Sequence, residues 1–415
     1  MNKNVIWTKG HIIKEFRIYP DDRGGDFLEL GPQLGYIKYY EDIIDPSLHV
    51  EISVVDTTGL IGKLPVRSGS AVRLKYTHPS QEDEVLLELV ISNIVGHTID
   101  NKREIYTLVC ETKAALSNNT TRVTKKYKGS ISETVKSIVG LIGSKVNTDP
   151  TQNKYEFFGN YRRPFKCIAD LCRKSIPTTV AKGGANSGSA GFLFFETLDG
   201  YQFRSIDALF AGKPQEDAYK MTPFKTGLDP ENNFMLASEP NFKESHDINK
   251  KLRAGAYSTA NWYYDIITRK VSFHNFRYNE SVEKANDEDV TPKDYRDFYS
   301  RIILGTIDHG TTSTPAEGAE LATPQDQART QAQASARYSA LFSQSLDITV
   351  PMNLSLRAGM MLNIDFPNIN TDRSLAKNSP ESGKYMIARL SHEMGNTDGD
   401  FTGLTLVRDS FTIHE

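Results

Sequence analysis

A short motif near the C-terminus begins like the metal-binding motif of zinc proteases. That motif needs two histidines four positions apart on a helix, with a glutamate directly after the first histidine. His392 and Glu393 match its start, but Asn396 stands where the second histidine is required. We therefore expect no zinc-dependent catalysis from this segment.

An acidic loop follows this motif. Residues 396–400 (Asn-Thr-Asp-Gly-Asp) have the alternating oxygen ligands of an EF-hand calcium loop. Such a loop needs a bidentate glutamate at its twelfth position, and that position is Val407. We interpret residues 396–400 as a polar hairpin turn.

The remaining candidates for chemistry are weak. Residues 140–145 contain glycines and a lysine, but they lack the spacing of a phosphate-binding loop. The acidic clusters at 21–22 and 287–289 are typical of solvated loops, whereas a glycosidase needs two carboxyls at a set separation across a cleft. Three cysteines, Cys110, Cys167 and Cys172, show no metal-binding spacing and are expected to be small buried side chains in a reducing compartment. We expect no catalytic residue, cofactor or metal, and hence no enzyme.

Charge is distributed unevenly along the chain. The 415 residues have a net charge of only −3, which argues against a protein that coats nucleic acid over its whole surface. Residues 101–182, however, contain 16 Lys and Arg against 6 Asp and Glu, so this stretch has a net charge of +10 and the remainder −13. Such asymmetry is informative about partners.

A short basic run lies inside this stretch. It predicts contact with an acidic protein surface or with phosphates, and the alternative is a solvated connector. The candidate residues for a protein-partner interface are Arg122, Lys125, Lys126, Lys128, Arg162 and Arg163.

The first third of the chain has the pattern of antiparallel strands. Apolar and polar residues alternate over residues 48–54 and 71–77, which is the period of a half-buried strand. Residues 84–94 and 104–115 are two longer apolar runs that we also predict as strands. Several strands at short spacing suggest a sandwich or a barrel.

The pattern changes to mixed α and β after about residue 117. Ser130 and Glu133 form a capping-box candidate before a helix with Ile131, Val135, Ile138 and Ile142 on one face. A second helix is expected to begin at Pro164. After a glycine-rich flexible loop at 183–191, an Asp-Gly turn predicts a hairpin of residues 192–195 and 201–204.

Strand patterns return after about residue 240. Residues 261–267 and 270–276 predict a hairpin, and residues from 310 to about 343 predict a loop followed by a polar helix. Four more strands are predicted at 346–350, 361–366, 384–392 and 401–407. The chain thus has a β block, a basic α+β block and a second β block.

Neither a membrane span nor an export signal is expected. No run of about 18 apolar residues exists, and the longest candidate, 85–95, is interrupted by Glu88. Residues 1–7 are not followed by the apolar segment of a secretory signal. The length corresponds to about two to four domains.

Ordered motifs in the C-terminal quarter carry a resemblance to a known family. They are Ile348–Met361 with Ile364–Pro367, then Ser382–His392, and finally Leu404–Ser410. Together they resemble the central baseplate hub protein of contractile-tailed bacteriophages, whose domains also occur in spike proteins of type VI secretion. Two further matches to the same family are Asp56 with Leu64–Leu74, and Phe194–Asp207.

The resemblance implies a mainly β fold with α+β insertions and two tube-like antiparallel β-barrel or sandwich domains in one chain. The implied divisions are 1–116 for the first tube-like domain, with strands that could return near 192–235, 117–238 for the basic α+β domain, and 239–415 for the second tube-like domain with a loop-helix insertion at about 308–344.

The resemblance also implies a function. It is a structural, homotrimeric symmetry adaptor that joins the hexameric tail tube to the trimeric spike and surrounds the DNA channel. Its expected partners are the tail-tube protein, the spike protein and a terminus of the tape-measure protein, with genomic DNA only as passing cargo. The expected location is the virion tail baseplate, after assembly in the host cytoplasm.

Two other functions remain open from the sequence. One is the base of a type VI or extracellular-injection spike. The other is a baseplate-associated cell-wall hydrolase, although no residue is a candidate for its catalytic group.

Overall fold

A computed structural model gives the fold of most of the chain. It describes residues 10–20, 27–57, 59, 66–78, 84–100, 102–178, 188–215, 218–221, 236–237, 240–245, 247–266, 268–277, 288–289, 298–306, 325–366, 379, 381–395 and 400–411. The glycine-rich segment 183–187, the segment 310–324, residues 396–399 of the polar turn, and the acidic residues 21–22 and 287 lie outside this description.

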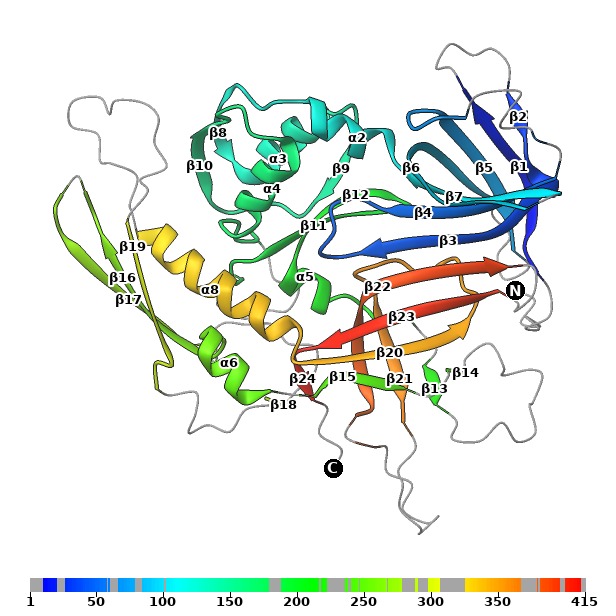
Figure 1. The fold of residues 1–415 in the computed structure, drawn as a ribbon. Helices are drawn as coiled ribbons and strands as arrows, with labels where there is room; N and C mark the ends of the chain where they lie inside the picture. Colours follow the sequence, from blue (N-terminus) through cyan, green and yellow to red (C-terminus); the bar gives the residue numbers. More distant parts are fainter. Residues whose placement is uncertain are drawn as a thin grey trace, which may run out of the picture.

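One large sheet of 14 strands dominates the fold (Figure 1). Its path runs β14-β13-β21-β22-β3-β4-β7-β6-β5-β1-β2, and a branch adds β23, β20 and β15 beside β22. The N-terminal strands are β1 (Ile12–Tyr19), β2 (Leu28–Glu29), β3 (Leu34–Asp42), β4 (His49–Asp56), β5 (Ala71–Thr77), β6 (Val85–Asp100) and β7 (Arg103–Glu111). The others are β13 (Tyr219–Met221), β14 (Leu236–Ala237), β15 (Asn241–Ser245), β20 (Gln344–Pro351), β21 (Met361–Asp365), β22 (Gly383–Gly395) and β23 (Phe401–Arg408).

The two β blocks meet where β22 pairs antiparallel with β3, in a register that aligns Arg389 with Asp42 and Glu393 with Lys38. Strands from both blocks also supply the same hydrophobic core, for example Ile37, Val50 and Leu390. The predicted mainly β fold with α+β insertions is thus confirmed. The sheet does not close into a barrel, because its path ends at β14 and β2.

Most of the predicted strands are confirmed, and one needs a correction. The expected strand at 104–115 ends at Glu111, and Ala115 belongs to helix α2 (Lys113–Thr120). Thr112 ends the strand because its side-chain oxygen accepts a hydrogen bond from the backbone N–H of Ala115, which caps the new helix.

The basic α+β region forms a lobe, here called the basic lobe (residues 121–205). Both of its predicted helices are confirmed: α3 begins at Ile131 and α4 begins at Pro164. The predicted capping box is wrong, because the Ser130 hydroxyl contacts the hydroxyls of Ser132 and Thr151, at 2.9 and 3.0 Å, and makes no capping bond. The lobe contains β8 (Lys126–Ser130), α3 (Ile131–Gly140), β9 (Val146–Thr148), β10 (Lys154–Phe158), α4 (Pro164–Cys172), β11 (Phe192–Thr197) and β12 (Gly200–Ser205).

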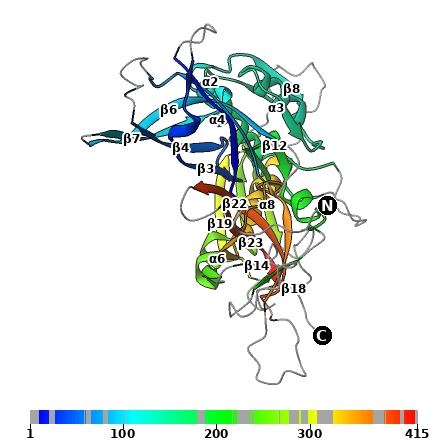
Figure 2. The same ribbon diagram turned by 90° about the vertical axis from the view of Figure 1, so that its right-hand side faces the viewer.

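A second, smaller sheet has the order β17-β16-β19. The predicted hairpin of β16 (Ser258–Tyr264) and β17 (Val271–Arg277) is confirmed, and so is the polar helix, α8 (Gln325–Leu341). In Figure 1 this sheet lies at the left, the large sheet at the right, and α8 runs between them; Figure 2 shows the same elements from the side. The other elements are β19 (Arg301–Thr306), α5 (Ile206–Phe210), α6 (Ile248–Ala254), η1 (Gly31–Gln33), and the short pair β18 (Glu288–Asp289) and β24 (Ser410–Phe411).

Candidate interaction surfaces

The basic lobe presents lysines because of strand alternation. Strands β8 and β10 pair antiparallel, and side chains alternate between the two faces of such a pair. Tyr127 and Phe157 point inward, with ring centroids 5.4 Å apart, and belong to the core of the lobe. Lys126 and Lys128 therefore lie on the outer face, where both are exposed.

The six predicted interface residues fall into small groups on this lobe. Glu156 lies 2.8 Å from the ammonium of Lys128 and 4.0 Å from that of Lys126. Arg162 forms an ion pair of 2.8 Å with Asp170 on α4. The lobe thus neutralises part of its own charge.

The other basic residues lie near one asparagine or in solvent. The Arg122 guanidinium donates a hydrogen bond to the backbone oxygen of Asn119 at 2.8 Å. The Arg163 guanidinium donates to the side-chain oxygen of the same asparagine at 3.1 Å. Lys125 is exposed. The structure therefore places all six residues on one lobe but does not gather them into a single patch.

A second surface was not recognised in the sequence. It is the solvent-facing side of the large sheet and is called the polar face here. Register places on it Lys38, Tyr40, Asp42, His49, Glu51, Glu111, Asp347, Thr349, Arg389, Ser391, Glu393 and Thr405, from strands β3, β4, β7, β20, β22 and β23. Of these, all but Arg389, which is exposed, are half-buried, while the residues between them in the sequence point into the core.

The polar face is continuous and net acidic. It crosses the seam between the two blocks without a break in alternation, because Asp42 and Lys38 oppose Arg389 and Glu393. Both pairs are ionic, at 2.6 Å for Asp42–Arg389 and 2.9 Å for Lys38–Glu393. Five carboxylates of the face stand against two basic side chains, apart from His49, and Lys243 on the neighbouring β15 adds a third cation through its ion pair with Asp347.

The alternation that places Glu393 on the polar face also separates it from His392. The His392 ring is buried, stacks on Tyr39 with centroids 5.7 Å apart and lies 3.0 Å from the Thr402 hydroxyl. Burial lowers the pKa of His392 to about 3, so the ring is neutral. Two neighbouring residues on opposite faces of a strand cannot serve as ligand and general base at one metal.

Asp400, the last residue of the predicted polar turn, forms hydrogen bonds with His11, which directly precedes strand β1. Its carboxylate accepts the backbone N–H of His11 at 2.6 Å and lies 3.0 Å from the His11 ring nitrogen. Within the described part of the chain, no three His, Cys, Asp or Glu side chains are grouped so that they could hold a metal ion.

Two buried glutamates join the α+β region to the β blocks. Glu41 accepts hydrogen bonds from the backbone N–H groups of Leu198 and Ala358, at 2.8 and 2.7 Å. Glu196 on β11 accepts from the N–H of Leu48 at 3.2 Å and from the hydroxyl of Thr112 at 3.0 Å. Burial outweighs these bonds and raises the pKa of Glu196 to about 7.

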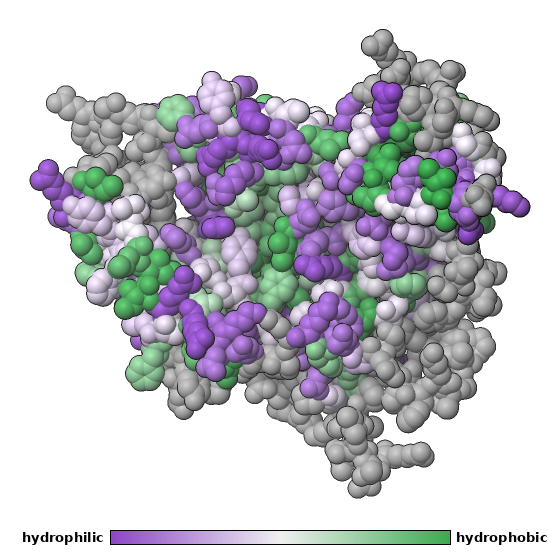
Figure 3. Space-filling view, in the orientation of Figure 1, coloured by the Kyte–Doolittle hydropathy of each residue, from purple (hydrophilic) through white to green (hydrophobic). Residues whose placement is uncertain are grey.

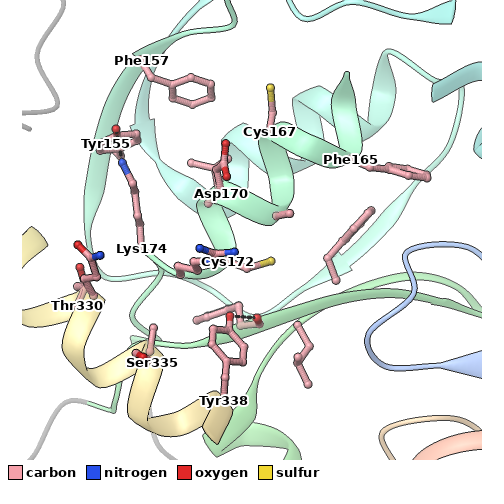
Figure 4. A pocket seen from close by; sticks show the side chains of 18 of the residues that line it. Tyr155, Phe157, Phe165, Cys167, Asp170, Cys172, Lys174, Thr330, Ser335 and Tyr338 are labelled. Atoms are coloured by element: carbon pink, nitrogen blue, oxygen red, sulfur yellow. Dashed lines mark hydrogen bonds between the residues drawn. The ribbon is translucent and has the colours of Figure 1, made fainter. Parts of the chain in front are cut away.

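A cleft of about 1250 Å³ separates the basic lobe from α8 (Figure 4). The thiols of Cys167 and Cys172 lie on its basic-lobe side, and burial raises the pKa of both, so neither is an activated nucleophile. No histidine lines the described walls. Residues labelled in Figure 4 are Tyr155, Phe157, Phe165, Cys167, Asp170, Cys172 and Lys174 from the basic lobe, with Thr330, Ser335 and Tyr338 from α8.

Among the described residues, no helix combines the length and the apolar composition that crossing a bilayer would need. No protein-family model and no curated protein matches the sequence.

Solved structures do match the fold. A tail protein from Neisseria meningitidis superposes with a TM-score of 0.56 over 96% of this chain and 97% of that chain, at 11% identity. The chain has the fold of a tail protein. A 43 kDa tail protein of prophage MuSo2 from Shewanella oneidensis gives 0.53 over 95% of this chain and 98% of that chain, at 10% identity. The resemblance to phage tail proteins is thus confirmed at the level of the fold.

Proposed function

We propose that this chain is a structural hub protein of a phage tail baseplate. Three copies would form a ring, and each would supply two β blocks, so that six similar units face the hexameric tail tube. The trimeric spike would bind the other side. The observation that carries this proposal is the polar face, which runs unbroken across strands of both blocks above one shared core.

In this ring the polar face lines the channel. A channel that passes DNA must not bind it, and a net acidic wall repels phosphates. Genomic DNA is then cargo only. The location is the virion tail, after assembly in the host cytoplasm, and no enzymatic step is part of the function.

The outer face of the basic lobe binds an acidic protein partner, either the spike or a terminus of the tape-measure protein. Its excess of positive charge supports this role. Individual exposed ion pairs contribute little free energy, so binding depends on the group of cations and weakens with salt.

The hub proposal is tested with the purified chain, the tube protein and the spike protein from the same genome. We expect light scattering to give three times the monomer mass of 46.5 kDa, and electron microscopy to show a ring that binds both proteins. A monomer that binds neither protein would contradict the proposal.

The basic-lobe proposal is tested by charge reversal of Lys125, Lys126 and Lys128 to Glu. We expect binding of the spike or the tape-measure terminus to weaken about tenfold at low salt, with a smaller loss at high salt. The matched control reverses Lys102, Lys136 and Lys145, which are also exposed and lie outside the groups formed by the six predicted residues. Equal loss in both variants would mean that only net charge matters.

A further inference from the structure

The small sheet β17-β16-β19 has an apolar side that faces solvent. Trp262 on β16 lies between Phe273 on β17 and Leu304 on β19, and the rings of Trp262 and Phe273 are in edge contact at 5.2 Å. Tyr264 likewise opposes Val271. This surface, called the apolar face, comprises Trp262, Tyr264, Val271, Phe273, Ile302 and Leu304.

These side chains are far from buried. Leu304 is 74% exposed, Phe273 61% and Ile302 59%. In Figure 3 green side chains gather at the left of the molecule, where Figure 1 shows this sheet. Monomeric soluble proteins rarely leave so many neighbouring large apolar residues in water.

The other side of the sheet is partly covered by α8 and partly lines the cleft. The Tyr263 hydroxyl donates to Gln331 on α8 at 3.0 Å, and Phe276 packs on the alanines of that helix. The reverse side combines Tyr263, Ile303 and Phe276 with polar residues such as Asn261 and His274, so the outward side is the more apolar of the two. The run Ile302-Ile303-Leu304 nevertheless lacks the alternation of a one-sided strand. Such runs are typical of strands buried on both faces.

Charge at the margin of the apolar face restricts how two copies can meet. Arg269, Lys270 and Arg277 are exposed beside it. A two-fold contact would bring these cations against themselves, which is unfavourable. A head-to-tail contact places them on another part of a second chain, and the chain outside residues 101–182 carries the net charge of −13.

The size of the apolar face fits a stable interface. The aromatic side chains Trp262, Tyr264 and Phe273, exposed to 42%, 42% and 61%, offer roughly 290 Å² at about 200 Å² each. The aliphatic side chains Val271, Ile302 and Leu304, exposed to 52%, 59% and 74%, add to this area. A standard interface buries about 800 Å² per partner, of which about 65% is apolar in homo-oligomers, or roughly 520 Å².

We propose that the apolar face binds a second copy of this chain, head to tail, and thereby closes the ring. The inference rests on the proposed homotrimer and names the surface that builds it. A second copy is the partner present at equal concentration from synthesis onward, as a large permanently apolar surface requires.

The test replaces Phe273 and Leu304 together with threonine, which keeps the strand preference of both positions. We expect trimer formation to weaken roughly 100-fold, measured by sedimentation across protein concentration. The control replaces Val95 and Ile99 on β6, which are also exposed, with threonine and stays trimeric. Circular dichroism checks that both variants are folded.

Three results would overturn the inference. In the first, the Phe273/Leu304 variant stays trimeric but loses the spike, so the apolar face serves another protein. In the second, the wild type floats with anionic vesicles and the variant does not, so it serves a membrane. In the third, the variant is trimeric and binds every partner normally, which leaves the hub proposal standing. A wild type that is monomeric would instead contradict the homotrimer itself.

Discussion

The two solvent-facing sheet surfaces of this chain differ in composition: one is polar and the other is apolar. On the polar face, side chains such as Lys38, Asp42 and Glu393 alternate with core residues, so only one side of the sheet is apolar. On the apolar face, Trp262 and Leu304 face water while the reverse side also packs against α8.

The polar face is therefore stable when exposed to water, whereas the apolar face is expected to be buried against a partner. A sheet with one apolar side is satisfied once that side is buried, so the polar face is stable in water or along a channel. A large apolar side that faces water needs a cover. The contrast predicts that substitutions on the apolar face change assembly, and that substitutions on the polar face change what passes over it.

The largest effect on stability is expected at the ion pairs that hold α8, the helix behind the small sheet, against the rest of the fold. Arg337 on α8 is buried between Asp207 and Asp409, at 2.7 Å from each carboxylate. Arg337→Met leaves two buried carboxylates without their cation. We expect the free energy of unfolding in urea to fall by about 3–5 kcal/mol.

The control for Arg337 is Lys136→Met, because Lys136 is exposed and forms its ion pair with the exposed Glu133. Its effect should stay below about 0.5 kcal/mol. Equal stability of the Arg337 variant and the wild type would show that α8 is held by apolar packing alone.

The next effect is a pH dependence of stability at Glu196, which connects the basic lobe to the first β block. Glu196 has its pKa raised to about 7 by burial, so the folded state holds this proton more tightly than the unfolded state does. Its contribution to stability is complete below about pH 4.5 and is lost as the pH rises through about 7. The loss is about 3 kcal/mol.

Glu196→Gln removes this titration, because it replaces the carboxyl group with an amide of nearly the same shape. We expect the difference in unfolding free energy between variant and wild type to change with pH between about 4.5 and 8 and to be constant above about pH 8. A difference that is constant over the whole range would contradict a raised pKa at Glu196.

Local sequence patterns predicted the strands and helices but not how elements distant in the sequence pair with one another. Alternation found strands such as 384–392, and apolar periodicity found the helix from Ile131, because both signals lie within a few residues of sequence. The pairing of β22 with β3 joins segments about 350 residues apart, and no local period encodes it. For the same reason, the sequence showed the six basic residues but not that Glu156 and Asp170 would neutralise three of them.

A smaller effect is expected on the polar face. Replacing Glu111, Asp347 and Glu393 with lysine turns this part of the proposed channel wall from repelling to attracting phosphates. We expect genome release from virions carrying the variant to slow several-fold, with binding of free duplex DNA that falls roughly 40-fold between 50 and 200 mM salt.

The control for the polar face places three lysines at Glu29, Glu84 and Glu133, which lie outside it. This variant has the same net charge, and it should bind free DNA without slowing genome release. Normal release from both variants would show that the polar face does not line the channel.

The smallest effect tests whether the basic lobe is built for stability or for contact. The ion pair of Lys128 and Glu156 spans β8 and β10 at 2.8 Å, but Lys128 is 70% exposed, so water and salt screen the attraction. Lys128→Ala should therefore change the unfolding free energy by less than about 1 kcal/mol. If the same variant weakens partner binding in a salt-dependent way, the lysine acts in recognition; a loss of stability without a loss of binding would assign it to the fold of the lobe instead.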